Sequence, residues 1–303
     1  MKTGFGGFWN RNFSHTVARK IVFMDTNCME PNPKEKVREP IVEGLLYPED
    51  PTALKDLLIR YGVSIPEPAG SSIGILTPHA AYDRCGILIA RAFRAVEKKE
   101  VDRAILIGPV HRDEEDAIFL PESTHFRTPL GNLAVDEEAV DALFSSGTKF
   151  LKNDIPHLEE HCLEIQLPFL AYHFPGVKIL PILMGKPSAS LVQLLAHSLK
   201  SVFSSRWDRI LLIVTSNGSK VTTQEEAEQE ADLFLDLIHK HDWKTLLKER
   251  AANRLGACGS GGVGTILQLF GSSLQFTLLE RVFCSEEKGK NGVVYLSGRI
   301  DVT

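Results

Sequence analysis

The sequence has few cysteines, no long hydrophobic run and no excess of positive charge. Five cysteines in 303 residues is a sparse and odd count, which excludes a disulfide-stapled scaffold. No apolar run approaches the roughly eighteen residues that a membrane helix needs, so we expect no membrane association. With 34 Lys and Arg against 39 Asp and Glu, the net charge is -5. This mild acidity argues against a nucleic-acid-binding protein.

The N-terminal residues lack the features of a signal peptide. Residues 1–15 are polar, aromatic and glycine-rich, without an apolar core or a small-residue cleavage site. We therefore expect a cytoplasmic, reducing location, where thiols stay free to act as ligands or nucleophiles. Residues 1–37 mix Arg, Asn, Gly and Pro, and they predict an irregular extension. The pattern becomes regular from residue 38 and predicts one domain over residues 38–303.

Hydrophobic periodicity within this domain alternates between two kinds of element. Short runs rich in Ile, Val and Leu predict buried strands at 73–77, 104–107, 177–183, 210–215, 274–282 and 293–297. Helical spacing occurs at 53–61, 86–96, 137–144, 163–172, 191–203 and 225–239. The alternation predicts a single-domain α/β sandwich, with a central, largely parallel or mixed sheet flanked by helices. The last two strands are close in sequence, so we expect them to pair as a hairpin.

Polar residues follow several of the predicted strands. His79 and His111 each come shortly after a strand and a proline, and the segment 215–220 (TSNGSK) follows the strand at 210–215. In open α/β sheets, ligands bind at the carboxyl ends of the strands. Two histidines therefore stand at the expected functional edge. The alternative is that each is a structural hydrogen-bonding group.

Two further candidates stand where helices begin. His161 precedes an apolar run, and Cys258 lies in a glycine-rich turn before residues 263–270. A cysteine at a helix N-terminus meets a positive dipole end that favours the thiolate, the form that binds metals or attacks electrophiles. The alternative for Cys258 is a small buried apolar residue. The glycines at 259–264 indicate a phosphate cradle only weakly, because the GK[ST] ending of a P-loop is absent.

Several motifs, in this order, resemble the Memo family, which includes bacterial and archaeal proteins called AmmeMemoRadiSam system protein B. They are REPIVEGLLYP at 38–48, TPHAAY at 77–82, ILIGPVHR at 105–112, RTPLGN at 127–132, EHCLEIQLPF at 160–169, KILPILMG at 178–185 and ACG at 257–259. The similarity covers residues 38–303 almost end to end, and EHCLEIQLPF is its most specific motif.

The resemblance implies a fold, a site and partners. The family resembles the class III extradiol dioxygenases in fold, with a pocket at the strand ends. Its members are implicated in binding copper or iron through two His and one Cys, and in redox chemistry. On this chain those residues are His79, His111 and Cys258, with His161 nearby. Thiolate with imidazole also suits zinc. Family association further implies radical SAM and AMMECR-like proteins as partners.

The sequence departs from the family pattern at one strand end. The family segment S-S-D-F-S-H is replaced by TSNGSK, so that Asn217 and Lys220 stand where the family has Asp and His. Asn is a neutral and poorer ligand than a carboxylate, and a Lys repels a divalent metal. Lys220 is instead a candidate for binding an anionic substrate beside the site.

Three functions are consistent with these residues. The first is a metal-dependent oxidoreductase that acts on oxygen or a small oxidisable substrate at a His-His-Cys pocket. The second is a non-catalytic family member that binds a peptide or an anion in the same pocket, as Asn217 and Lys220 suggest. The third is an enzyme with Cys258 as nucleophile and His79 or His111 as base. We rank them in this order, so the metal-dependent oxidoreductase is the function that the sequence favours, and the other two are its alternatives.

Overall fold

A computed structural model describes residues 35–63, 72–96, 100–112, 115–204, 207–285 and 290–303, which belong to one compact unit, Lys34–Thr303. The predicted extension, residues 1–37, lies outside the described residues except at its end, where β1 (Val37–Arg38) begins. Among the described residues, no helix combines the length and the apolar character needed to cross a bilayer.

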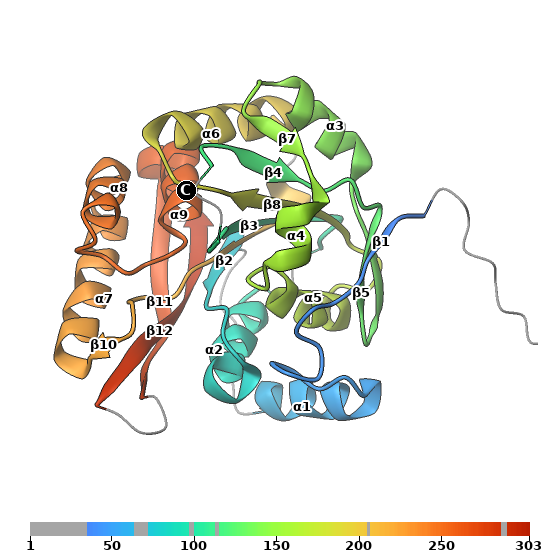
Figure 1. The fold of residues 1–303 in the computed structure, drawn as a ribbon, viewed down its shortest axis with the longest axis horizontal. Helices are drawn as coiled ribbons and strands as arrows, with labels where there is room; N and C mark the ends of the chain where they lie inside the picture. The colour runs from blue at the N-terminus through green and yellow to red at the C-terminus, as the bar shows by residue number, and fades with distance from the viewer. Residues whose placement is uncertain (1–34, 64–71, 97–99, 113–114, 205–206, 286–289) are drawn as a thin grey trace, which may run out of the picture. The chain divides into compact units, whose positions relative to one another are not determined.

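The centre of the described structure is a mixed sheet (Figure 1). Its middle strands run parallel in the order β2 (Gly74–Thr77), β9 (Ile210–Thr215), β3 (Arg103–Pro109) and β8 (Lys178–Met184). These four are buried along almost their whole length, as continuous Ile, Leu and Val runs require when both sheet faces are covered. The predicted strands at 73–77, 104–107, 177–183 and 210–215 are therefore confirmed.

Other strands extend the sheet at both sides. Beyond β2, β12 (Asn291–Val302) pairs antiparallel with β2, β10 (Thr222–Thr223) and β11 (Leu274–Ser285), which confirms the predicted hairpin. Beyond β8 lie β4 (Ile118–Leu120) and β7 (Phe150–Lys152). A smaller sheet joins β1 to β5 (His125–Thr128) and β6 (Gly131–Ala134). The short strands β4 to β7 have no counterpart among the predicted elements.

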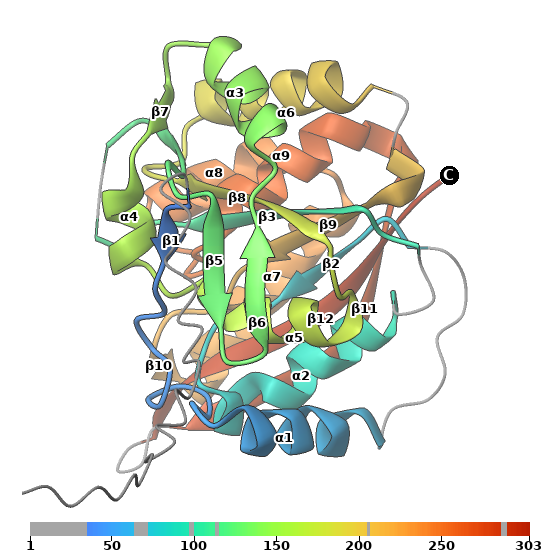
Figure 2. The ribbon, with the colours of Figure 1, turned by 90° about the vertical axis from the view of Figure 1, so that its right-hand side faces the viewer.

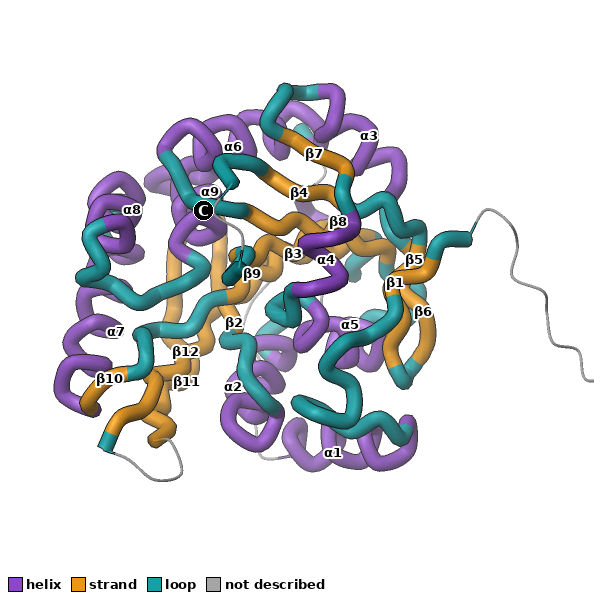
Figure 3. Tube along the Cα trace, in the orientation of Figure 1, coloured by secondary structure: helices purple, strands orange, loops and turns teal. Residues whose placement is uncertain are grey.

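Helices cover both faces of the central strands, which confirms the predicted α/β sandwich. Figure 2 shows α1 (Pro51–Val63) and α2 (Tyr82–Arg94) on one side of β3 and β9, and α6 (Ala189–Phe203) and α9 (Ser260–Phe270) on the other. The remaining helices, purple in Figure 3, are α3 (Glu137–Ser145), α4 (Asp154–Glu159), α5 (Leu167–His173), α7 (Gln224–His239) and α8 (Trp243–Ala251). Short 3-10 turns cover Glu164–Gln166, Trp207–Arg209 and Gly271–Ser273.

Parallel alignment puts the carboxyl ends of the middle strands at one edge. Thr77 of β2 stands beside Thr215 of β9, and Pro109 of β3 beside Met184 of β8. The segments that leave these four positions therefore begin side by side, and they carry the candidate site.

Candidate metal centre

His79 leaves the end of β2 and is almost fully buried. Its Nδ1 lies 2.7 Å from Oγ1 of Thr215, the last residue of the neighbouring strand. Its backbone N–H donates to Oδ1 of Asn217 at 3.3 Å. Because Nδ1 is engaged by the threonine hydroxyl, Nε2 is the ring nitrogen left to face another group.

His111 leaves the end of β3 and is held by a buried carboxylate. Oε2 of Glu160 lies 2.9 Å from both the backbone nitrogen and Nδ1 of His111. A carboxylate at Nδ1 fixes the ring orientation and leaves Nε2 as the free nitrogen. Glu160 was not among the site residues predicted from the sequence, although its position beside His161 in the EHCLEIQLPF motif was an available signal.

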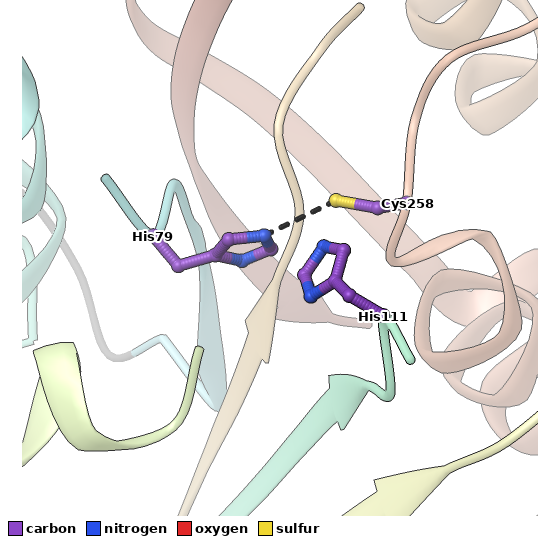
Figure 4. A group of neighbouring side chains, drawn as sticks. All are labelled: His79, His111 and Cys258. Atoms are coloured by element: carbon purple, nitrogen blue, oxygen red, sulfur yellow. Dashed lines mark hydrogen bonds between the residues drawn. The ribbon is translucent and has the colours of Figure 1, made fainter. Parts of the chain in front are cut away.

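Cys258 comes from the loop before α9 and completes the cluster. Its Sγ lies 3.2 Å from Nε2 of His79 and accepts the backbone N–H of Asn217 at 3.4 Å. One donor atom from each of His79, His111 and Cys258 lies within 4.8 Å of the others. Figure 4 shows the three side chains converging from separate segments of the chain.

Glycines let α9 and its loop approach the strand ends closely. A Cβ at position 259 would lie 2.2 Å from the carbonyl oxygen of Thr215, and one at 262 would lie 3.0 Å from side chains of both Ile107 and Val214. The glycine-rich segment therefore packs α9 on β9 and β3 and carries Cys258 to the strand ends. This packing explains the glycines at 259 and 262 without a phosphate ligand.

The charges of the cluster reinforce one another. Burial opposes ionisation of the Cys258 thiol, but interactions with His79 and His111 prevail and hold the pKa of Cys258 well below its usual range. Burial also works against a proton on His111, yet hydrogen bonds to Cys258 and Glu160 raise the pKa of His111 to about 10. The metal-free cluster therefore pairs a thiolate with an imidazolium at neutral pH.

His161 lies beside the cluster and shares the same carboxylate. Oε1 of Glu160 accepts the backbone N–H groups of His161 and Cys162 at 2.9 and 3.0 Å, and it lies 3.2 Å from Nδ1 of His161. The ring centroid of His161 is 5.9 Å from that of His79 and 5.8 Å from that of His111. Burial raises the pKa of Glu160, but hydrogen bonds from both imidazoles outweigh it and hold the pKa well below the ordinary range. One buried carboxylate thus positions two imidazoles.

The two departures from the family pattern have different surroundings. Asn217 holds the site together through its hydrogen bonds to His79 and Cys258. Nζ of Lys220 lies 3.0 Å from Oε1 of the buried Glu230 and donates to the carbonyl oxygen of Asn253 at 3.1 Å. Its ammonium is therefore engaged by α7 and by the segment after α8.

A pocket of about 350 Å³ opens beside His111 and Cys258. Its walls come from the segment after β3, the segment after β8, the end of α8 and the start of α9. Two cationic residues, Lys186 and Arg250, are among its lining residues. Neither residue was among the site residues predicted from the sequence. Lys186 stands three residues after the end of the predicted strand at 177–183, which was a signal of the same kind as the position of His79.

An α/β sandwich with two imidazoles and a thiolate gathered at the carboxyl ends of parallel strands defines a class of protein with a candidate metal centre. Comparison with known families specifies this class further. The chain belongs to the Memo family, because the family model described as Memo-like protein matches residues 38–290.

Curated relatives carry the same family name. A MEMO1 family protein of Desulfurococcus amylolyticus is 30% identical over 245 residues, covering 77% of this chain and 87% of the relative. A MEMO1 family protein of Thermotoga neapolitana is 29% identical over 255 residues, covering 79% and 90%. Among solved structures, an uncharacterized protein from Escherichia coli K12 matches with a TM-score of 0.46 and 10% identity, over 75% of this chain and 98% of that chain.

Proposed function

We propose that this chain is a metal-dependent oxidoreductase, which binds copper or iron through His79, His111 and Cys258 and acts on a small molecule in the adjoining pocket. The observation that supports the proposal is the convergence of three donor atoms within 4.8 Å. Ligand atoms about 2.0–2.3 Å from a shared tetrahedral metal are roughly 3.6 Å apart, so the spacing fits such a centre.

The chemistry of the donors supports the same assignment. A thiolate with two imidazoles suits copper, zinc or iron better than magnesium or calcium, which prefer oxygen ligands. Both imidazoles have second partners that fix their orientation, Thr215 for His79 and Glu160 for His111. Copper or iron, when bound, supplies electron transfer, and zinc does not. The oxidoreductase proposal is therefore specific to copper or iron.

The protein groups around the donors have separate tasks in this proposal. Cys258 supplies the anionic ligand as a thiolate, so the proton that leaves on metal binding at neutral pH comes from His111, whose pKa is raised to about 10. His161 is partly exposed, with 34% of its side chain accessible, and it lies next to both ligating histidines. This position allows it to exchange protons between solvent and a molecule bound next to the ligating histidines.

Metal titration tests the proposal. We expect the full chain to bind one equivalent of Cu(I) or Fe(II), and His79→Ala or Cys258→Ser to weaken binding by more than about tenfold. The matched controls are His197→Ala, an exposed histidine on α6, and Cys284→Ser, a thiol on β11. Equal binding by the site variants and the controls would refute the proposal.

One observation favours a second candidate function, a cysteine nucleophile. Sγ of Cys258 lies 3.2 Å from Nε2 of His79, and its pKa is lowered, as in thiolate–imidazole pairs that attack electrophiles. This candidate predicts that chelator-treated protein retains its turnover of an ester or thioester substrate and that Cys258→Ser abolishes it. Turnover that requires Cu(I) or Fe(II) would favour the oxidoreductase.

A further inference from the structure

Two cationic side chains line the pocket beside Cys258, and no described carboxylate lines it with them. Lys186 follows β8, and Arg250 lies near the end of α8; both line the pocket. Neither makes an ion pair within the described part of the chain. The described lining residues also include no Asp or Glu. The part of the pocket wall that Lys186 and Arg250 form is therefore cationic, and a concave cationic surface concentrates anions.

Neighbouring cations outside the pocket differ in this respect. Arg254, four residues after Arg250, makes two hydrogen bonds to the carboxylate of Glu249 at 2.6 and 2.8 Å. Lys220, the residue that the sequence suggested for anion binding, is paired with Glu230. Carboxylates thus engage these two cations, whereas no carboxylate in the described ranges pairs with the two that line the pocket. An arginine donor fork and a lysine ammonium together match the oxygens of a carboxylate or phosphate.

We infer that the pocket binds a small oxyanionic molecule, whose carboxylate or phosphate group contacts Lys186 and Arg250 and whose other end reaches His111 and Cys258. A volume of about 350 Å³ is near the lower limit of small-molecule sites and is too small for a folded partner. The inference names the substrate class for the proposed oxidoreductase and rests on that function for its catalytic meaning. Anion binding itself does not depend on a metal.

Two alkylating reagents of nearly equal size provide the test, because iodoacetate carries a carboxylate and iodoacetamide is neutral. The rates at Cys258 are measured on chelator-treated, full-length protein, with mass spectrometry to separate Cys258 from the other thiols. The iodoacetate-to-iodoacetamide rate ratio is compared with that of 2-mercaptoethanol. We expect Cys258 to favour iodoacetate, and Lys186→Gln and Arg250→Gln each to lower the ratio about threefold.

Lys248→Gln is the matched control, since Lys248 is exposed on the same helix as Arg250 and does not line the pocket. An equal fall of the ratio in Lys248→Gln, or no fall in the two pocket variants, would overturn the inference. Protection of Cys258 by inorganic phosphate and by acetate, at equal ionic strength, then identifies the preferred oxyanion. Metal titration of wild type, Lys186→Gln and Arg250→Gln separates the two proposals. If the iodoacetate-to-iodoacetamide ratio falls in the two variants while wild type binds no metal, the anion site is supported and the metal-dependent oxidoreductase is not.

Discussion

Replacing Glu160 by Gln removes the group that holds both His111 and His161, with almost no change in shape. Oε2 of Glu160 accepts hydrogen bonds from the backbone nitrogen and Nδ1 of His111, while Oε1 accepts hydrogen bonds from the backbone nitrogens of His161 and Cys162. The glutamine amide has one oxygen, so its NH₂ group must face one of these two pairs. In either orientation, two hydrogen bonds are lost, and the NH₂ donor of the glutamine faces the N–H donors that the carboxylate oxygen had accepted.

The size of the effect follows from these contacts. A hydrogen bond to a charged group contributes about 1.5–3 kcal/mol, and the Glu160 side chain is only 4% exposed, so solvent screens it little. Loss of two such bonds, partly offset by relaxation, predicts a fall of about 3 kcal/mol in the free energy of unfolding. In either orientation of the amide, the negative charge that holds the His111 imidazole is lost, so we expect metal affinity to fall about 10- to 100-fold.

Two measurements on the same variants check this prediction. Urea denaturation of metal-free protein gives the free energy of unfolding, and competition with a chromogenic chelator gives metal affinity. The control is Glu159→Gln, the same charge change at the adjacent, exposed position. It should alter stability by less than about 0.5 kcal/mol. If Glu160→Gln lowers stability but leaves metal affinity at the level of the control, Glu160 does not position His111, and the reasoning is wrong.

Two further predictions concern acid stability and the approach of α9. Burial lowers the pKa of His157 to about 4. Below about pH 6.5, His157 is therefore protonated in the unfolded state while it stays neutral in the folded state, down to about pH 4. Wild-type stability should therefore fall by roughly 3 kcal/mol more than that of His157→Gln between pH 6.5 and 4 in urea denaturation, and parallel profiles would contradict this. Ala at position 259 would place its Cβ 2.2 Å from the Thr215 carbonyl and displace Cys258. We expect Gly259→Ala to weaken metal binding about tenfold, and Gly62→Ala, which meets no atom within 4 Å, to leave it unchanged in the same titration.

The sequence was most informative about the middle of the sheet. Strands β2, β3, β8 and β9 are continuous apolar runs, so their positions follow from composition and length alone. Because they are parallel, whatever follows β2 and β3 lies at one edge. The proximity of His79 and His111 could be predicted from that rule, before any contact was known.

Contacts made at long range could not be predicted in this way. Glu160 reaches His111 across 49 residues, and although its place beside His161 marks it as a candidate, no local pattern specifies His111 as its partner. The strands β4 to β7 have three or four residues each, which is too short for an alternating or continuous apolar pattern to be recognised in the sequence. Lys220 follows a strand end as the rule requires, yet Glu230 on α7 holds its ammonium. Strand-end position identifies the candidates, and tertiary partners decide which of them face the pocket.

The motifs at 38–48 and 160–169 build the support of the site rather than its ligands. Nε of Arg38 donates to the carbonyl oxygen of His157 at 2.9 Å, and Nη2 donates to that of Glu160 at 3.2 Å. Nη1 pairs with Glu164, and both side chains are 1% exposed. Glu164 in turn accepts the hydroxyl of Tyr47 at 2.8 Å.

This buried ion pair joins segments 126 residues apart in the chain. Removing either partner would leave an unpaired buried charge, at a cost of about 3–5 kcal/mol. The pair clamps the main chain at Glu160, whose carboxylate then orients His111 and His161. A long motif of high specificity therefore need not contribute a ligand. Here, fixing Nε2 of one histidine requires a carboxylate, and fixing that carboxylate requires a buried ion pair with its own hydrogen-bond partners.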